Sequence, residues 1–321
     1  MKLSIAMCTY NGGAYLREQL ESICTQTRLP DELVICDDGS SDATRDILQT
    51  FVARAAFPVR LFFNAHNLGS TKNFEQAIRR CDGEIIALSD QDDVWKTEKL
   101  ERLEKALLAR PQAGLVFTNA EVVDENLRPL GHRLFPAFGF TPKRQKMVTS
   151  GKVFEVLLTQ NIVTGATMAF RADLRSLILP IPTEFPLIHD GWIALIIAAV
   201  ADLIFINQPL IKYRQHVHQQ MGVRQEEFLK SVTVARKTDP SVYMNHVEQF
   251  ERAYDHLLAN RDLCRERVQP LLEAKIKHLR ARAAMPAHRL SRIPVVFREV
   301  LSRRYSRYSR GLYSAARDLA F

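Results

Sequence analysis

Two clusters of aspartates are the residues of this sequence best suited to chemistry. Asp90-Gln91-Asp92 and Asp37-Asp38 each come directly after a short apolar run. Carboxylates one residue apart suit a hard divalent cation such as Mg²⁺ or Mn²⁺, which keeps some waters and takes other ligands from substrate phosphates. A solvated turn before a helix would also place acidic residues here, because they are favoured at helix N-termini. If both clusters lie at one edge, however, their charges repel unless a cation or hydrogen-bond donors compensate them, which favours a cation site.

Short apolar runs alternate with amphipathic segments over the first 125 residues. The runs predict strands over Leu3–Cys8, Glu32–Cys36, Val59–Phe63, Glu84–Leu88 and Gly114–Thr118. The segments between them predict helices over Ala14–Thr25, Asp42–Ala53, Ser70–Arg80 and Thr97–Leu108. Such alternation implies βαβ units and a mostly parallel sheet. Ligands bind beyond the carboxyl ends of the strands in these sheets, which is where both aspartate clusters lie.

The pattern is weaker after Glu125. Leu130–Lys146 has no clear period and is interpreted as an irregular loop. A strand is expected over Gly165–Phe170 and a buried helix over Asp190–Ala201. Two strands are expected over Leu203–Ile206 and Leu210–Tyr213, and two long helices over Val242–Val268 and Leu271–Ala284. The predicted fold class is therefore α/β, with a mostly parallel sheet flanked by helices, followed by a helical region.

The composition is that of a folded, soluble protein. Of the 321 residues, 46% are hydrophobic and 25% are charged, which argues against a disordered or fibrous chain. The five cysteines are scattered, as expected for reduced thiols in the cytoplasm. No secretory signal peptide is indicated, and the longest apolar stretch, Trp192–Ala201, falls short of the roughly 20 residues that span a bilayer.

The net charge of +8 is concentrated near the C-terminus. From Lys275 onward, twelve Lys and Arg residues stand against only Glu299 and Asp318. Nucleic-acid binding would need a base-reading or stacking motif, which the sequence lacks, and a solvated helical tail is the remaining alternative. We favour the surface of an anionic membrane, because an apolar strip accompanies the arginines. This strip comprises Leu290, Ile293, Val295, Val296, Phe297, Val300 and Leu301.

Several motifs together resemble one family of enzymes. Thr9-Tyr10-Asn11, DDGSSD at 37–42 and SDQDDVW at 89–95 resemble the nucleotide-sugar-binding half of a family 2 glycosyltransferase with the GT-A fold. Further along, TGATMAF at 164–170, HDGW at 189–192 and YRQH at 213–216 resemble the rhamnosyltransferase-like branch of that family. The resemblance covers roughly residues 1–220, and the motifs occur in the order that the family has.

The resemblance implies how the donor would be bound. Thr9-Tyr10-Asn11 would touch the base and ribose, and Asp38 would read the edge of the base. Asp90 and Asp92 would hold Mn²⁺ or Mg²⁺ on the donor diphosphate, with Asp92 as the more direct ligand. Lys72 would steady the diphosphate as a point charge or, equally, would lie exposed in the first turn of a helix.

The resemblance also implies where the reaction takes place. Asp190 matches the catalytic base of inverting members, which accepts the proton of the acceptor hydroxyl; capping the next helix is the alternative, and both roles are compatible. Trp192 would contact substrate. Arg214 would bind phosphate and His216 would be a further metal ligand, the alternative being a basic strand end with a solvent-facing histidine. Zinc is rejected, because cysteine ligands and paired spacing are missing.

The resemblance implies a domain boundary between residues 222 and 223. Residues 1–222 would form the GT-A domain, with 1–125 as the nucleotide-sugar-binding half and 126–222 as the acceptor half, and 223–321 would form a helical, basic region. The expected activity is a metal-dependent, inverting transfer of a sugar, with dTDP-rhamnose as one candidate donor. The acceptor would be a saccharide or polyprenyl-linked saccharide of a cell-surface polysaccharide. The protein would be cytoplasmic and peripheral on the inner face of the membrane, with no nucleic-acid partner.

Two other functions remain open. A sugar-phosphate nucleotidyltransferase shares such a sheet and its metal-binding carboxylates, but it usually begins with a Gly-rich, basic phosphate loop. Here Asn11-Gly12-Gly13 is followed by Ala-Tyr-Leu, which argues against it. A non-catalytic subunit of a polysaccharide assembly complex would have no need of Asp90, Asp92 and Asp190 together.

Overall fold

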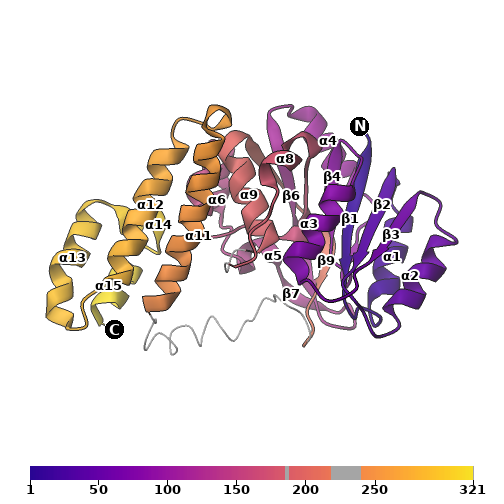
Figure 1. Ribbon diagram of the computed structural model, residues 1–321, viewed down its shortest axis with the longest axis horizontal. Coiled ribbons are helices and arrows are strands. Elements are labelled where there is room, and N and C mark those ends of the chain that lie inside the picture. Colours follow the sequence, from indigo (N-terminus) through magenta and orange to yellow (C-terminus); the bar gives the residue numbers. More distant parts are fainter. Residues whose placement is uncertain (185–187, 218–239, 321) are drawn as a thin grey trace. The chain divides into compact units, whose positions relative to one another are not determined.

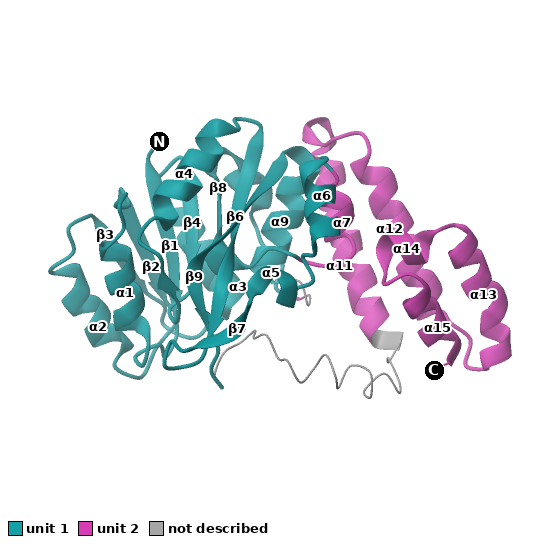
Figure 2. Ribbon diagram, turned by 180° about the vertical axis from the view of Figure 1, so that it is seen from behind, with its two compact units in different colours: residues 1–151, 162–183, 188–223 teal, residues 152–161, 184–187, 224–321 magenta. Residues whose placement is uncertain are grey.

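The computed structural model of the chain describes residues 1–184, 188–217 and 240–320. The chain divides into two compact units (Figure 2). The N-terminal unit comprises residues 1–151, 162–183 and 188–223, and the C-terminal unit comprises 152–161, 184–187 and 224–321. The segment 152–161 thus belongs with the C-terminal helices, whereas the sequence analysis placed it in the first domain.

A mixed sheet forms the centre of the N-terminal unit (Figure 1). Its described strands run in the order β3-β2-β1-β4-β8-β6-β9-β5, with β7 paired to β6. Strands β1 to β4 are mutually parallel, and β8 is antiparallel to both β4 and β6. The strands are β1 Leu3–Thr9, β2 Glu32–Asp37, β3 Val59–Phe63, β4 Ile85–Ser89, β5 Val94–Trp95, β6 Ala113–Val123, β7 Pro129–Arg133, β8 Met168–Arg171 and β9 Asp202–Arg214.

Helices cover both faces of this sheet (Figure 1). Alternate residues of β1, namely Leu3, Ile5 and Met7, belong to a buried cluster with α1, α2 and α4. Helices α3 and α9 pack on the strands from the other side. The helices of this unit are α1 Leu16–Cys24, α2 Thr44–Val52, α3 Ser70–Arg80, α4 Lys99–Ala109, α5 Leu134–Ala137, α6 Pro142–Thr149, α8 Arg175–Ile178 and α9 His189–Val200. The predicted α/β class with a mostly parallel, helix-flanked sheet is confirmed.

The structure differs from the sequence prediction after residue 125. Leu130–Lys146, predicted to be an irregular loop, contains most of β7, all of α5 and the start of α6. The residues of β7 are mostly exposed, so that apolar alternation could not reveal it. Thr141 caps α6 and is followed by Pro142, a start signal that the sequence did contain. The two strands predicted between 203 and 213 are one, β9, whose pairing with β6 shifts register near Pro209.

The C-terminal unit is built from helices. Helices α11 Pro240–Ala259 and α12 Val268–Ala283 lie side by side, as both views show (Figures 1 and 2). The helix predicted over Val242–Val268 ends at Ala259, because a 3₁₀ turn over Arg261–Leu263 interrupts it. The remaining helices are α7 Val153–Leu157, α13 Arg289–Leu301, α14 Arg304–Tyr308 and α15 Leu312–Ala320.

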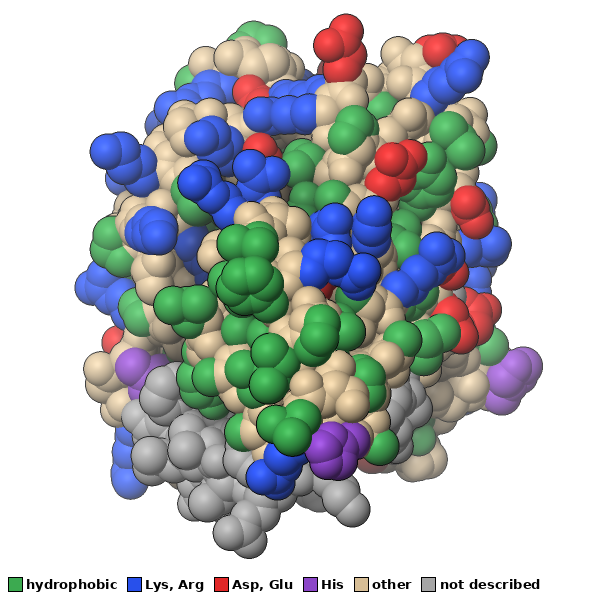
Figure 3. Space-filling model, turned by 90° about the vertical axis from the view of Figure 1, so that its left-hand side faces the viewer, with side chains coloured by type: hydrophobic (Ala, Val, Ile, Leu, Met, Phe, Trp, Pro, Cys, Tyr) green, Lys and Arg blue, Asp and Glu red, His purple; other side chains and the backbone are tan. Residues whose placement is uncertain are grey.

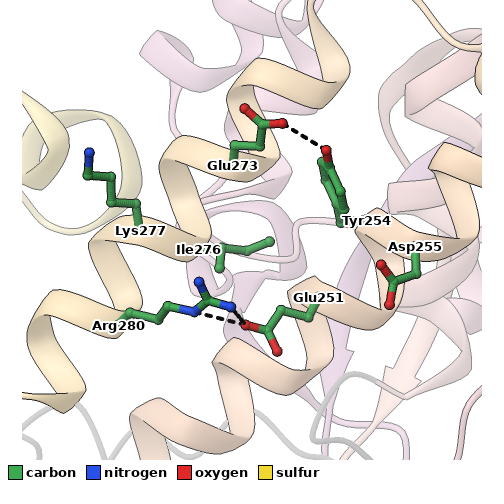
Figure 4. A pocket seen from close by; sticks show the side chains of 7 residues that line it. All are labelled: Glu251, Tyr254, Asp255, Glu273, Ile276, Lys277 and Arg280. Carbon is green, nitrogen blue, oxygen red and sulfur yellow. Dashed lines mark hydrogen bonds and ion pairs between the residues drawn. The ribbon is translucent and has the colours of Figure 1, made fainter.

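A pocket of about 670 Å³ lies between α11 and α12 (Figure 4). Two pairs of its polar side chains connect the two helices: Arg280 Nε lies 3.0 Å from Glu251 Oε1, and the hydroxyl of Tyr254 donates to Glu273 over 2.7 Å. These pairs join the two helices. The pocket shares no residue with the site predicted from the sequence.

Buried polar contacts hold the last three helices onto α12. His278 lies between Glu299, 2.8 Å away, and Ser309, 2.9 Å away. Lys275 is also buried, and its ammonium group donates to the carbonyl of Tyr308 over 3.0 Å. Burial, aided by the positive charge of a neighbouring arginine, lowers the pKa of Lys275 to about 7.

The lowered pKa of Lys275 predicts a pH dependence of stability. An unfolded lysine titrates near pH 10.4, so between about pH 7 and 10 the unfolded chain binds more protons at this position and the free energy of unfolding rises with pH. The rise is about 1–2 kcal/mol between pH 7.5 and 9. Urea unfolding at these two pH values should show it in the wild type and in Lys277→Met, whose lysine is exposed on the same helix. Lys275→Met should lack it, and a slope equal to that of the wild type would contradict the assignment.

Candidate active site

The first strand ends lie next to each other at one edge of the sheet. Thr9, the last residue of β1, pairs with Asp37, the last residue of β2, and Met7 pairs with Ser89 at the end of β4. The loops that follow β1, β2 and β4 therefore begin side by side. The predicted gathering of Tyr10, Asp38 and Asp90 at one edge follows directly from this register.

Gln91 fastens the Asp90–Asp92 loop to the loop after β1. Its side-chain oxygen accepts from the backbone N–H of Tyr10 over 2.8 Å, and its side-chain N–H donates to the carbonyl of Tyr10 over 2.9 Å. A Cβ atom on Gly12 would lie 2.2 Å from the Gln91 oxygen, so glycine makes room for this contact. Sequence reasoning missed the role of Gln91 and treated it as the spacer between two aspartates.

Carboxylates from distant parts of the chain interact at this edge. Burial, followed by the negative charges of Asp92 and Asp190, raises the pKa of Asp90 to about 7. Burial and the charges of Asp92 and Asp90 also raise the pKa of Asp93 well above its ordinary value. One oxygen of Asp93 accepts from the backbone N–H of Arg214 over 3.0 Å, and the other has no hydrogen-bond partner among the residues described. The structure thus brings Asp90, Asp92 and Asp190 together, as the sequence predicted.

Lys99 is a buried cation beside these carboxylates that sequence reasoning missed. Its ammonium nitrogen donates to the carbonyl of Ala166 over 2.7 Å and lies 3.5 Å from the ring centre of Trp95. Burial lowers its pKa, while the charges of Asp93 and Asp90 act in the opposite direction. A signal was present, because Lys99 falls on the same face of α4 as the core residues Leu103 and Leu107.

Asp190 lies in the first turn of α9. The predicted alternative, that Asp190 is the N-cap, is wrong, because the helix begins at His189 and Ile188 is the N-cap residue. The Asp190 carboxylate instead accepts hydrogen bonds from the backbone N–H groups of Gly165, over 3.3 Å, and Gly191. The turn at Gly165 therefore orients Asp190.

His189, the residue before Asp190, packs against Phe74 and Gly165. Its ring stacks on Phe74, with 4.1 Å between ring centres, and burial lowers its pKa to about 3, so the imidazole is neutral. A Cβ atom on Gly165 would lie 2.9 Å from His189 Nε2, closer than ordinary packing allows. His189 and Gly165 together fix the start of α9.

His216 and Asp92, both predicted metal ligands, are neighbours. His216 Nε2 lies 2.9 Å from Asp92 Oδ2. The alternative of a solvent-facing histidine is wrong, because the His216 side chain is only 7% exposed and packs near the ring of Tyr15. Its other nitrogen, Nδ1, is buried with no hydrogen-bond partner in the described part of the chain.

Arg214 is buried and connects several segments by hydrogen bonds. Its side chain is 1% exposed, and Nε donates to the carbonyl of Asp92 over 2.7 Å. Its other guanidinium nitrogens donate to the carbonyl of Glu125 and the carboxylate of Glu18, and the group lies over the ring of Tyr15. The guanidinium thus presents almost no surface to a phosphate, in contrast to the predicted binding role. Arg214 positions Asp92 and Asp93 through the backbone.

Trp192 lies in the interior. It is 2% exposed, and its indole N–H donates to the carbonyl of Ile178 over 2.9 Å. The substrate contact predicted for Trp192 finds no exposed surface in this arrangement. The side chain instead packs α9 against the segment that contains α8.

The other predicted donor-binding residues lie at the same edge with different surroundings. Thr9 is buried and its hydroxyl donates to Asp37 over 2.9 Å, whereas Tyr10 is 48% exposed. The Asn11 side-chain oxygen accepts from the backbone N–H of Ser41 over 2.9 Å. Tyr10 and Asn11 are thus the residues of this segment with exposed surface.

Asp38 binds the loop after β3, and Lys72 lies in the helix that follows this loop. One Asp38 oxygen accepts from the Asn64 side chain over 2.8 Å and from the backbone N–H of Leu68 over 2.9 Å, and the other accepts from the N–H of Gly69 over 2.9 Å. Lys72, at the start of α3, lies 3.1 Å from Glu75 and is partly exposed. Asp38 therefore shapes this loop, and its role toward a base remains a prediction.

The residues present fit a cation that a substrate helps to hold. No group of three or more His, Cys, Asp or Glu side chains within residues 1–184, 188–217 and 240–320 is arranged to hold a metal by itself. Asp90 and Asp92 nevertheless offer hard oxygen ligands, and the negative charge of Asp92 disfavours ionisation of Asp90. Mg²⁺ and Mn²⁺ bind well to one or two carboxylates together with substrate phosphates.

Comparison with solved structures supports the fold. The S. aureus TarS fragment 1–349 with UDP-GlcNAc superposes with a TM-score of 0.54 at 18% identity, covering 96% of this chain and 88% of that one. The mannosyltransferase PcManGT of Pyrobaculum calidifontis, with GDP-Man and Mn²⁺, superposes with a TM-score of 0.51 at 16% identity, covering 95% of this chain and 75% of that one. At these identities the likeness concerns the fold alone.

Curated relatives match part of the chain. An uncharacterized glycosyltransferase of Nostoc is 27% identical over 225 residues, 67% of this chain and 65% of that protein. The putative teichuronic acid biosynthesis glycosyltransferase TuaG of Bacillus subtilis is 30% identical over 128 residues, 40% of this chain and 50% of that protein. The Escherichia coli UDP-Glc:alpha-D-GlcNAc-diphosphoundecaprenol beta-1,3-glucosyltransferase WfgD is 30% identical over 125 residues, which are 39% of this chain and 47% of that protein. The chain thus spans less than two thirds of the length of each of these relatives.

The family follows from the extent of one match. The profile of Glycosyl transferase family 2 matches residues 4–175, more than half of the chain. This range contains the strand ends, the aspartate clusters and the turn that orients Asp190. The protein therefore belongs to glycosyl transferase family 2.

Proposed function

We propose that the protein is a metal-dependent, inverting glycosyltransferase. It transfers a sugar from a nucleotide-sugar donor to a lipid-linked or growing cell-surface polysaccharide. One observation carries this proposal: Asp190, far from Asp90 in the sequence, is close enough to it for its charge, together with that of Asp92, to raise the pKa of Asp90. A cation-binding pair of carboxylates and a separate carboxylate for proton transfer thus meet at the open ends of parallel strands.

Asp90, Asp92 and His216 would hold the metal. A bound Mn²⁺ or Mg²⁺ supplies positive charge to the departing diphosphate. Arg214 and Gln91 hold the loop that carries both aspartates, so the ligands are placed before substrate arrives. The exposed Tyr10 and the partly exposed Lys72 are the residues that contact the nucleotide and its phosphates.

Asp190 is the base. In an inverting transfer the acceptor hydroxyl attacks the anomeric carbon on the face opposite the departing nucleotide, and its proton must go to a nearby acceptor. The N–H of Gly165 fixes the direction of the Asp190 carboxylate, and the neutral His189 adds no competing positive charge.

The substrate class rests on the relatives and on the motifs. The printed names of TuaG and WfgD concern teichuronic acid and a diphosphoundecaprenol acceptor, which favours a cell-envelope polymer on a lipid carrier. The segments at 164–170, 189–192 and 213–216 favour the rhamnosyltransferase-like branch and dTDP-rhamnose as donor. A lipid carrier favours a location at the membrane surface, and we propose its cytoplasmic face.

The donor can be identified by ligand-induced stabilisation. A panel of nucleotide sugars that includes dTDP-rhamnose, UDP-glucose and UDP-GlcNAc should contain one that raises the melting temperature by about 5 °C at roughly 100-fold excess over its Kd. The shift should require Mn²⁺ or Mg²⁺. Equal shifts with and without metal would remove the metal from donor binding, and stabilisation by UDP-glucose but not dTDP-rhamnose would exclude rhamnose.

Asp92→Asn tests the metal site. The substitution removes a negative ligand but keeps the size of the side chain, so metal-dependent donor binding should weaken by about 100-fold. Asp46→Asn, which neutralises an exposed aspartate on α2, is the matched control and should leave binding unchanged. Titration calorimetry with the identified donor and Mn²⁺ measures both, and equal affinity of Asp92→Asn and the wild type would exclude Asp92 as a ligand.

Asp190→Asn separates binding from turnover. The amide cannot accept the hydroxyl proton, so kcat should fall by about 10²–10⁴-fold, the usual contribution of a general base. Donor affinity should stay within about twofold of the wild type, because Asp190 acts on the acceptor. Turnover near that of the wild type would show that another group is the base.

A further inference from the structure

Helix α13 has two apolar faces, and only one of them is covered. Val296 is buried with Tyr305 and Ala315 in the small core of the last three helices. The opposite side carries Leu290, Ile293, Phe297 and Leu301, which are 69%, 50%, 62% and 67% exposed. Leu290, Phe297 and Leu301 are spaced by seven and four residues, so they line one side of the helix. We call these four residues the outer face of α13.

The fold separates the charges around this face. The chain from Lys275 onward has two acidic residues, and both point inward. Glu299 is fully buried against His278 and Arg304, and Asp318 pairs with the buried Arg282. Five arginines of the same segment are exposed: Arg289, Arg298, Arg303, Arg307 and Arg310. Figure 3, which views the side where Figure 1 draws α13, shows hydrophobic side chains gathered together with Lys and Arg side chains around them. The sequence showed an excess of basic residues near the C-terminus. Because the two acidic residues are buried and these arginines are exposed, the surface around α13 is positively charged.

We propose that the outer face of α13 and the exposed arginines beside it bind the surface of an anionic lipid bilayer. This inference rests on the proposed function, because a lipid-linked acceptor is found only at such a surface. Helix α13 would lie in the plane of the bilayer, with its outer face among the acyl chains and its arginines at the lipid phosphates. Within residues 1–184, 188–217 and 240–320, none of the helices has the length and hydropathy of a membrane span.

Charge selects this occupant over a second copy of the chain. A symmetric dimer through the outer face would bring two sets of arginines together, and like charges disfavour it. An anionic bilayer offers apolar depth and negative charge at once, and Arg289 and Arg298 lie on the two flanks of the outer face. The thirteen residues of α13 form about 20 Å of such a surface.

Point substitutions test the surface better than a truncation, because removing the last helices would leave His278 and Arg282 without their buried partners. The full chain should float with phosphatidylcholine vesicles that contain about one quarter phosphatidylglycerol. It should not float with phosphatidylcholine alone, and binding should weaken in ~0.5 M salt. Phe297→Ser/Leu301→Ser and Arg298→Glu should each lower the partition coefficient at least about tenfold.

Two controls lie on α4 in the other unit. Leu108→Ser alters a leucine of similar exposure, and Arg102→Glu reverses an exposed charge; both should float like the wild type. Equal flotation of Phe297→Ser/Leu301→Ser and the wild type would overturn the proposal, as would a dimer in solution that this variant dissociates. Stabilisation of each variant by donor and Mn²⁺, measured without vesicles, is independent of lipid. If it persists while flotation fails, the surface assignment falls and the proposed function stands; if it is missing in the wild type, the function falls instead.

Discussion

The mutual repulsion of carboxylates crowded at one edge of a sheet is the constraint on which the site depends. The charges of Asp92 and Asp190 raise the pKa of Asp90, and those of Asp92 and Asp90 raise the pKa of Asp93, in both cases after the effect of burial. Protein interiors tolerate such a group only when other groups compensate it. The chain supplies part of the compensation through Lys99 and the backbone N–H of Arg214, and the rest is available to a divalent cation.

The surrounding structure can be understood as the means of holding this edge in place. The parallel pairing of β1, β2 and β4 brings three loops together, and Gln91 ties two of them to each other. Arg214, at the end of β9, reaches back to Asp92, and the turn at Gly165 reaches Asp190. Strands far apart in the sequence thus set the positions of the reactive side chains, as rigid elements should in a preorganised site.

Much of this could be predicted from the sequence. Apolar runs located β1 to β4, and the helical spacing of apolar residues located α3, each to within about a residue. The convergence of Asp90, Asp92 and Asp190 followed from strand ends and motifs. Burial of individual side chains did not follow as readily: Arg214 looks like a surface cation in the sequence, and Trp192 looks like a ligand contact. Their positions depend on packing between elements, which local patterns do not encode.

Anomalous scattering from Mn²⁺ in crystals grown with a nucleoside diphosphate tests the central claim most directly. A manganese peak within about 2.0–2.3 Å of a carboxylate oxygen of Asp92, shared with the diphosphate, is the predicted result. A peak elsewhere, or a bound diphosphate with no manganese beside Asp90 and Asp92, would contradict the account.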